Sequence, residues 1–430
     1  MKKSLVATLL VALLASSMVF AGFGGNVTAS FGWDIDNETV GFNNANAPEI
    51  ELTLNETAGE KKGEGAVYAE IKAKLVVKLS KVTGVKATTT KDDSLEVKAE
   101  IKDLSAKVIG DKWYVGITGA MGPADFAKSY NVDGDKKDFW NWKSGAVKVS
   151  GVEVGAFGYT AGIGFNKNYI LDTEKGAFFT VKTVEYKLIE GLTAQAGATF
   201  AVQDKEFENY QLGFGGKVGY TNGALTANVA TDMGVEIAPG VKEEDRFNAE
   251  IAADAKYDFV SANVYFTTLP VKGESKKALP SLAKENLLNL KAAADFASFK
   301  VPATLSVEMI DTVHKERTLG VNAGYTIMKG LKVGAEYKTN FLENIEWSLG
   351  GNVEYAMDIA TFKAGVTFGS KKVSADNTHN TLGFTASAES TKLISGATLK
   401  LDYSKNNINL WDNAPKNTSG VIVASCKIAF

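Results

Sequence analysis

The chain has few of the residues that build metal centres, nucleophilic sites and disulfides. Its 430 residues include one cysteine, Cys426, and two histidines, His314 and His379. A single cysteine forms no internal disulfide, and this inventory supplies no Cys/His metal cluster. A Ser-His-Asp site would have to use one of the two histidines, and both fall in segments expected to be loops. We therefore expect no enzymatic activity, no metal site and no cofactor.

Long apolar runs are also missing beyond the amino terminus. After Ala21 no stretch of about 18 apolar residues occurs, so the sequence predicts no transmembrane helix. Before it, a Lys2-Lys3 start precedes an apolar core, Leu5–Leu14, that is shorter than the roughly 20 residues needed to span a bilayer. The segment 1–21 therefore predicts a secretory signal peptide cleaved near Ala21. The rest of the chain, 22–430, is expected to form one domain.

Neither sign of charge dominates the chain, and proline is scarce. The formal net charge is −3, with 47 basic and 50 acidic side chains, which does not favour nucleic acid as a partner. There are 7 prolines against 42 glycines, and 10% of the residues are aromatic. This balance is typical of many long strands joined by tight turns.

What the chain has in abundance is alternation of apolar and polar residues over segments of about ten residues, as transmembrane β-strands require. The clearest case is a pair of segments around a turn at Met328-Lys329-Gly330. Apolar side chains there occupy every second position: Leu319, Val321, Ala323, Tyr325, Leu331, Val333, Ala335 and Tyr337. Side chains of a strand point alternately to its two faces, so each segment has one apolar and one polar face.

Short turns and long polar connections alternate along the chain. The predicted short turns are Gly110-Asp111, Ser150-Gly151, Glu190-Gly191, 221–223, Asp258-Phe259, 297–299, 328–330, Met357-Asp358 and Ser395-Gly396. The predicted long connections are 203–208, 232–245, 269–285, 311–316, 369–380 and 404–419. This asymmetry is typical of outer-membrane barrels, and it predicts an all-β, single-chain, antiparallel up-and-down transmembrane barrel with an even number of strands, about 20 and within 18–22. The first strand, from Asn26, and the last, from Gly420, should then be neighbours.

The last strand carries a recognisable pattern. Its apolar face is formed by Ile422, Ala424, Cys426, Ile428 and Phe430. A terminal aromatic preceded by apolar residues at every second position resembles the carboxyl-terminal signature of bacterial outer-membrane β-barrels. The resemblance implies that the barrel-assembly machinery reads this strand. With the predicted leader and the alternating strands, the whole of 22–430 resembles a porin-like outer-membrane barrel, and its Lys-rich, Arg-poor, alanine-alternating style is similar to that of spirochaete porins.

This resemblance implies a water-filled channel through which small hydrophilic solutes and ions diffuse passively. Its partners would be outer-membrane lipids, the assembly machinery and solutes, and association into a homo-oligomer stays open. Two alternatives remain: a structural or adhesive barrel whose surface loops bind a partner, and a secreted soluble β-protein. The soluble alternative is disfavoured because apolar faces such as that of Ala194, Ala196 and Ala198 would fill a sandwich core poorly.

Charged side chains of both signs fall on the polar faces and are the candidates for lining the channel, where they would tune ion selectivity. These candidates are Lys72, Lys74, Lys78, Glu96, Lys98, Glu100, Lys332, Glu336, Lys338, Glu346, Glu354, Lys363, Lys400, Asp402 and Lys427. The segment 121–142 is either an external loop or, by resemblance to porins, a loop that folds inward and narrows the channel. Its candidate constriction residues are Asp125, Lys128, Asp133, Asp135, Lys136, Lys137 and Asp138.

Overall fold

The computed structural model describes most of the chain from Phe23 onward. The described residues are 23–35, 39–41, 49–59, 65–83, 93–121, 124–127, 149–165, 177–202, 208, 210–237, 239, 243, 246–268, 287–312, 316–340, 346–374, 377–409 and 420–429. The predicted leader 1–21 and the terminal Phe430 lie outside these ranges, so the signal peptide and its cleavage site stay predictions.

The described chain is almost entirely β-strand. The first half comprises β1 (Phe23–Asp34), β2 (Thr39–Gly41), β3 (Glu49–Gly59), β4 (Tyr68–Thr83), β5 (Asp93–Ile109), β6 (Trp113–Met121), β7 (Val149–Ala156), β8 (Tyr159–Phe165), β9 (Ala177–Lys182), β10 (Tyr186–Ile189), β11 (Leu192–Val202) and β12 (Tyr210–Asn222). The second half comprises β13 (Leu225–Ile237), β14 (Phe247–Tyr257), β15 (Val260–Thr267), β16 (Leu287–Asp295), the 3₁₀ turn η4 (Phe296–Phe299), β17 (Ala303–Thr312), β18 (Glu316–Met328), β19 (Leu331–Asn340), β20 (Trp347–Ala356), β21 (Thr361–Ser374), β22 (Asn377–Ser390), β23 (Ala397–Asn409) and β24 (Val421–Ala429).

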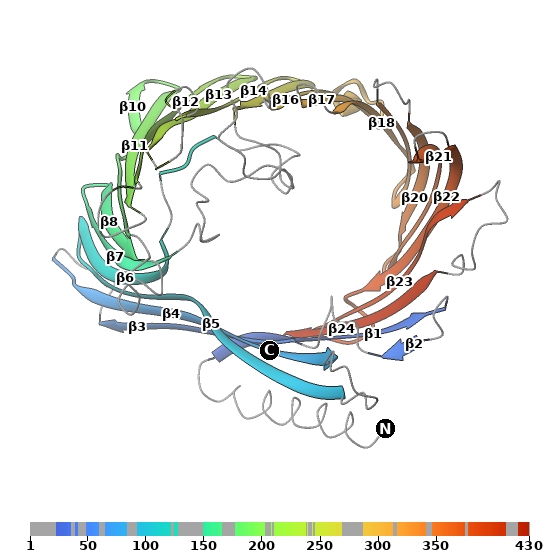
Figure 1. Cartoon of the computed structure of the whole chain (residues 1–430), viewed down its shortest axis with the longest axis horizontal. Coiled ribbons are helices and arrows are strands. Elements are labelled where there is room, and N and C mark those ends of the chain that lie inside the picture. The colour runs from blue at the N-terminus through green and yellow to red at the C-terminus, as the bar shows by residue number, and fades with distance from the viewer. Residues whose placement is uncertain are drawn as a thin grey trace.

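These strands form one closed antiparallel wall in which each strand pairs with the next along the chain (Figure 1). Two positions in the wall are each shared by two short strands. β2 and β3 pair with different parts of β1, and β9 and β10 pair with different parts of β11. The wall therefore has 22 strand positions. The prediction of an even-numbered, up-and-down barrel within 18–22 strands is confirmed.

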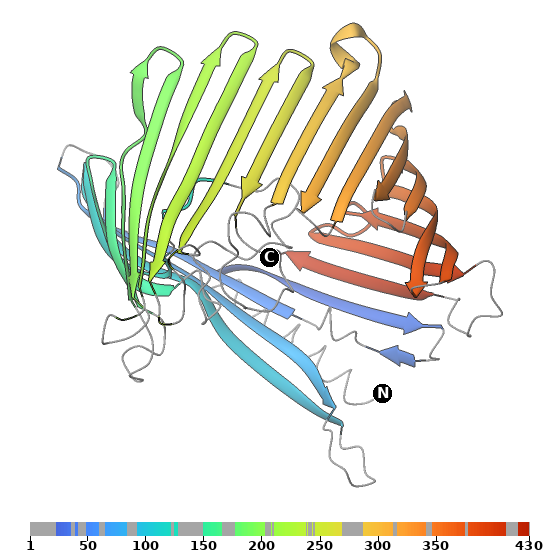
Figure 2. The same cartoon turned by 45° about the horizontal axis from the view of Figure 1, so that its top comes forward.

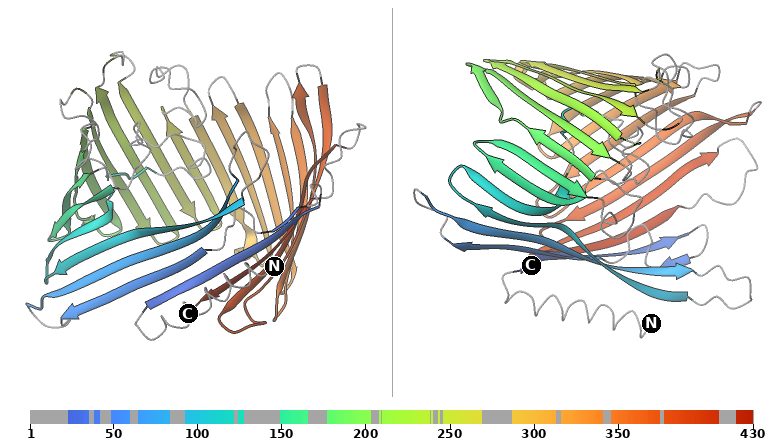
Figure 3. Two further views of the ribbon diagram at one scale, coloured as in Figure 1. Left: turned by 60° about the horizontal axis from the view of Figure 1, so that its bottom comes forward. Right: turned by 60° about the vertical axis from the view of Figure 1, so that its left-hand side comes forward.

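The barrel closes through its first and last strands, which lie side by side in Figures 1 and 3. β1 and β24 pair antiparallel over nine residue pairs, from Asn26 with Ala429 to Asp34 with Val421. Closure removes the unpaired edges that an open sheet would present, so both strands have their backbone groups satisfied. The prediction that these two segments are neighbours is confirmed.

Most of the predicted short turns join the strands as expected, and they line one edge of the barrel in Figure 2. The turn predicted at Ser150-Gly151 is wrong, because both residues lie within β7. The turn comes later, at Phe157 and Gly158, whose φ angles of 53° and 86° give the backbone twist that a two-residue hairpin needs. Directly after the predicted turn, Val152 and Val154 alternate with polar and small residues, as in an extended strand.

Four predicted long connections are shorter than expected. The one predicted at 311–316 shrinks to 313–315, between β17 and β18. β13 continues to Ile237 although a connection was predicted from 232, β23 continues to Asn409 although one was predicted from 404, and the connection predicted at 369–380 shrinks to 375–376 between β21 and β22. Polar residues indicate the end of a strand only when both faces of that strand are buried among apolar groups. In a wall with a polar inner face, a polar stretch continues as a strand.

The outward face of the wall is apolar and open. Large side chains such as Phe214, Val366 and Leu401 are between 41% and 51% exposed, and they belong to strands from different parts of the ring. In the predicted hairpin, Leu331 and Val333 are half-buried and Ala335 is exposed, so none of them lies in a protein core. Few apolar residues are buried at all in the described ranges, which is what a wall one strand thick produces.

Candidate functional site: the inner face of the barrel

The charged candidates on β19 to β24 belong to one continuous face. Directly paired residues of antiparallel strands point to the same side of the sheet, so partners can be followed from strand to strand. From β19 round to β1 the series is Lys332, Glu354, Lys363, Ser387, Asp402, Val423 and Gly32. The apolar residues between them fall on the opposite face. The alternation seen in the sequence thus becomes two surfaces of one wall.

Several of these charges pair across neighbouring strands. The Glu354 carboxylate lies 3.0 Å from Lys363 Nζ and 3.8 Å from Lys332 Nζ, so one acid on β20 joins bases on β21 and β19. On β23, Lys400 and Asp402 are 2.8 Å apart, and on β19 Lys338 pairs with Glu336. Exposed ion pairs of this kind contribute about 0–1 kcal/mol each, so they order the charges more than they stabilise the wall.

A second charged region lies on β3 to β7. Lys74 and Lys78 on β4 each lie 2.7 Å from a carboxylate of β3, those of Glu51 and Glu49. Lys72 pairs within β4 with Glu70 at 3.1 Å. Farther round, Glu153 on β7 accepts hydrogen bonds from Lys107 Nζ (2.8 Å) and from the hydroxyl of Tyr114 (2.7 Å).

The remaining charged candidates take different places. Lys98 and Glu100 on β5 and Lys427 on β24 are exposed. Glu96 also lies on β5, but its side chain is outside the described set. Glu346 comes before β20, where its backbone N–H donates to Asn340 Oδ1 (2.7 Å) and its carbonyl accepts from the Asn340 N–H (2.9 Å). That these residues line a conducting passage stays a prediction.

A short piece of the predicted constriction segment lies inside the ring. Ala124–Ala127 follows β6 and runs along the inner face of β11 to β15, where Figure 1 draws it in teal within the barrel. The Ala124 N–H donates to Thr199 Oγ1 on β11 at 2.9 Å. Ala127 packs with Ala252 and with Tyr265, whose side chain is fully buried. We call Ala124–Ala127 the inner segment.

Asp232 on β13 is the main polar anchor of the inner segment. Its Oδ2 accepts hydrogen bonds from the backbone N–H groups of Phe126 (2.8 Å) and Ala127 (2.6 Å). Its paired residue on β12 is Gly215, and a Cβ there would clash with Asp232 Oδ1. Gly197 on β11 has the same role for Ala124, because a Cβ at Gly197 would lie 2.7 Å from the Ala124 Cβ. The glycines of 213–216 are residues of β12, and Gly215 makes room for the anchor.

The wall behind the inner segment is lined by buried polar side chains. Glu250 on β14 accepts a hydrogen bond from the Tyr265 hydroxyl at 3.0 Å, and both side chains are at most 1% exposed. Other polar side chains on β11 to β16 are at most 2% exposed: Thr199, Gln211, Asn248, Thr267 and Asn289. Buried polar groups are stabilising only where they are hydrogen-bonded, as the Tyr265 hydroxyl and Glu250 are here.

Sequence analysis missed this anchor. Asp232 was placed at the start of a long connection, but it lies within β13. The signal was present in the outward residues Val229 and Val235, which put Asp232 on the inward side. Of the predicted constriction residues, only Asp125 is described, within the inner segment and exposed. The others lie outside the described residues: Lys128, Asp133, Asp135, Lys136, Lys137 and Asp138.

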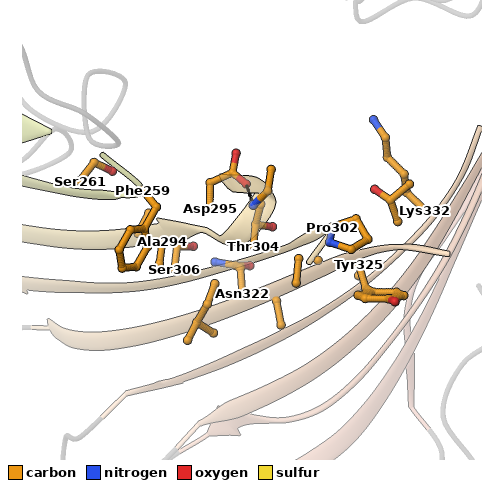
Figure 4. A pocket seen from close by; sticks show the side chains of 18 of the residues that line it. Phe259, Ser261, Ala294, Asp295, Pro302, Thr304, Ser306, Asn322, Tyr325 and Lys332 are labelled. Carbon is orange, nitrogen blue, oxygen red and sulfur yellow. Dashed lines mark hydrogen bonds between the residues drawn. The ribbon is translucent and has the colours of Figure 1, made fainter. Parts of the chain in front are cut away.

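The inner face holds an open groove farther round the ring, next to the inner segment's side. A depression of about 990 Å³ runs near the short-turn end of β14 to β20 and is lined by residues such as Lys291, Asn322 and Lys332 (Figure 4). Phe259 borders it and packs edge-on against Phe299 of η4, with ring centroids 4.8 Å apart. Basic, acidic and amide side chains, such as Lys332, Asp295 and Asn322, line it beside apolar ones.

The predicted assembly residues of β24 share the apolar outward face with β1. Ala424 pairs with Phe31, and Ile422 pairs with Trp33. Cys426 pairs with Ala29 and is a half-exposed free thiol, while Ile428 is exposed beside Val27. The pattern that resembles an assembly signal is therefore presented outward on the closing strand.

Among the residues the structure describes, no helix is both long enough and apolar enough to cross a membrane. Nor do these residues bring together three or more His, Cys, Asp or Glu side chains that could hold a metal ion.

Comparison with known proteins finds likeness only at the level of architecture. No family model and no curated protein matches the chain. Among solved structures, the translocation pore of the P pilus usher PapC has a TM-score of 0.40 and 8% identity, covering 95% of this chain and 99% of its own. Pseudomonas aeruginosa OccK7 has a TM-score of 0.40 and 10% identity, with 95% and 98% covered. A triple mutant of the Rhodopseudomonas blastica porin has a TM-score of 0.34 and 12% identity, with 95% and 99% covered. Scores this low assign the chain neither a family nor a solute.

Proposed function

We propose that the chain is an outer-membrane channel of a diderm bacterium through which small hydrophilic solutes and ions diffuse passively. The observation that carries this proposal is the two-faced closed wall. Its outward side presents large apolar side chains around the ring, and its inward side carries the paired charges of β3, β4 and β19 to β23. Lipid accepts the first surface and water the second.

The size of the ring supports a passage rather than a filled interior. Barrels of about 8 strands are filled by side chains, whereas those of about 16 or more leave an aqueous channel. With 22 strand positions this wall belongs to the wide class. The inner segment occupies part of one side of the lumen, beside β11 to β15, while the groove on β14 to β20 stays open. A secreted soluble protein would leave the entire outward face in water.

The proposal also includes a leader at the amino terminus and an assembly signal on β24. Segment 1–21 acts as a leader that is cut near Ala21, and the outward face of β24 is read by the barrel-assembly machinery. The function is transport without catalysis. The adhesive alternative is not favoured by any described feature, because the long connections 269–286 and 410–419 lie outside the described residues.

Single-channel recording tests the proposal. Purified protein folded in detergent is added to planar bilayers in potassium chloride, and discrete conductance steps that scale with salt concentration are expected. The same protein unfolded by heat before addition is the control. A folded barrel, verified by its heat-modifiable mobility in gel electrophoresis, that gives no steps would overturn the channel.

A further inference from the structure

The short turns carry the most exposed apolar side chains of the described chain. Every large apolar residue more exposed than Leu349, at 53%, lies on or beside a short turn. Six of them come from six different turns: Phe157, Ile189, Phe299, Met328, Ile359 and Leu393, with exposures between 56% and 73%. We call these six residues the apolar rim. They follow one edge of the barrel, where the turns stand in a row in Figure 2.

Turn geometry explains the exposure but not the choice of residue. Tight turns in water favour glycine, asparagine, aspartate and serine, because these residues suit the backbone and are well hydrated. The turn of β12 and β13 follows this rule with Asn222 and Gly223. A rim of Phe, Ile, Leu and Met in its neighbours is an apolar surface that a water-exposed collar would not need.

A charged residue is next in sequence to five of the six rim residues, all but Phe157. Glu190 follows Ile189, Lys300 follows Phe299, and Lys392 precedes Leu393. An apolar side chain beside a charge of either sign suits the boundary between acyl chains and headgroups, where apolar atoms turn inward and charges remain hydrated. Just beyond the rim, the outward residues Tyr325 and Phe362 continue the apolar wall without a polar gap.

We propose that the apolar rim lies in the interfacial layer of a phospholipid leaflet. The inference rests on the proposed membrane channel and deepens it, because it fixes where the membrane ends along the wall. The lipid boundary reaches the short turns, so no water-exposed band of strands lies between the lipid and the turns at that end.

Spin-label accessibility tests this placement. In a Cys426→Ser background, single cysteines at Ile359 and Leu393 carry a nitroxide, and the protein is reconstituted in phosphatidylcholine vesicles containing phosphatidylglycerol. Collision with oxygen, which concentrates in lipid, is compared with collision with a water-soluble nickel chelate. The matched controls are Val366→Cys on the outward wall and Glu243→Cys on the connection between β13 and β14.

The expected result is that both rim labels favour oxygen over the nickel chelate, as Val366 does, while Glu243 favours nickel. Nickel accessibility at Ile359 and Leu393 equal to that at Glu243, with Val366 still in lipid, would overturn the rim placement and leave the channel standing. Nickel accessibility at Val366 would instead overturn the membrane channel itself. Spin–spin broadening at both rim sites would show contact between two copies and would also overturn the lipid placement.

Discussion

The carboxylate of Asp232 lies 2.6 Å from the amide nitrogen of Ala127, a residue 105 positions earlier in the chain. The contact joins the inner segment to the wall on the side where the buried polar residues gather. A hydrogen bond to a charged group contributes about 1.5–3 kcal/mol, so two such bonds from one carboxylate hold a short segment against thermal motion. Asp232 therefore holds the inner segment against the wall together with Thr199 and Tyr265.

Replacement of Asp232 should release the inner segment. In Asp232→Ala both hydrogen bonds from Phe126 and Ala127 are lost, so we expect a higher mean single-channel conductance and larger current noise. Asp232→Asn keeps one oxygen acceptor and should have a smaller effect. Asp254→Ala, also inward and hydrogen-bonded to Asn228 of the wall, is the control. Unchanged conductance in Asp232→Ala would mean that the inner segment does not limit the current.

Gly215→Ala should displace the Asp232 carboxylate by a clash within the wall. The added methyl group would collide with Asp232 Oδ1 and with the Thr231 carbonyl oxygen 2.7 Å away, so the carboxylate must move off the inner segment. We expect the conductance phenotype of Asp232→Asn with a folded barrel. Gly320→Ala is the matched control, because its nearest neighbour would be Lys338 Cγ at 3.8 Å. Equal behaviour of the two alanine variants would contradict the role given to Gly215.

A charge on the outward wall should destabilise the barrel in lipid. Val366 lies near the middle of β21 and is 41% exposed, and arginine on a lipid-facing strand costs about 2–4 kcal/mol near the bilayer midplane. We therefore expect Val366→Arg to lower the free energy of unfolding in vesicles by about that amount. The neighbouring Thr367→Arg, on the inward face, should change it far less. Reversible urea unfolding followed by tryptophan fluorescence measures both free energies. A larger loss in Thr367→Arg than in Val366→Arg would mean that the inward and outward faces are assigned the wrong way round.

Charge reversal at the Glu354 cluster should change ion selectivity. Lys332 and Lys363 both approach Glu354, and replacing both with glutamate turns a mixed cluster into an acidic one. The reversal potential in a potassium chloride gradient should shift toward the potassium equilibrium potential. Lys112→Glu, on the turn between β5 and β6, should shift it less. Stability should hardly change, because exposed pairs contribute about 0–1 kcal/mol.

Alternation in the sequence was enough to predict the closed wall. A period of two places each residue on a face, and the run from Leu319 to Tyr337 showed it clearly enough for the hairpin to be assigned correctly. Glycine-containing turns such as Met328-Lys329-Gly330 then marked the ends of strands, because Gly330, with φ of 85°, supplies the left-handed backbone. Both signals are local, and a barrel repeats local signals around a ring.

The inner segment could not be predicted in the same way. Its contacts with Thr199, Asp232 and Tyr265 join parts of the chain that are far apart in sequence, and nothing local marks them. The polar character of 232–245 argued for a connection, although Asp232 and Glu236 of that stretch lie on the inward face of β13. The misplaced turn at Ser150-Gly151 has a related cause, since glycine is tolerated inside a strand when the paired strand or a side chain approaches closely, as Tyr114 approaches Gly155.

Pairing of β24 with β1 has a consequence for how the molecule is made. In translation β24 follows the other described strands. A sheet formed without β24 would have two unpaired edges, one on β1 and one on β23. Such edges pair readily with foreign strands. A chain truncated before Val421 should therefore aggregate more readily than the full chain, because β1 would lack its partner.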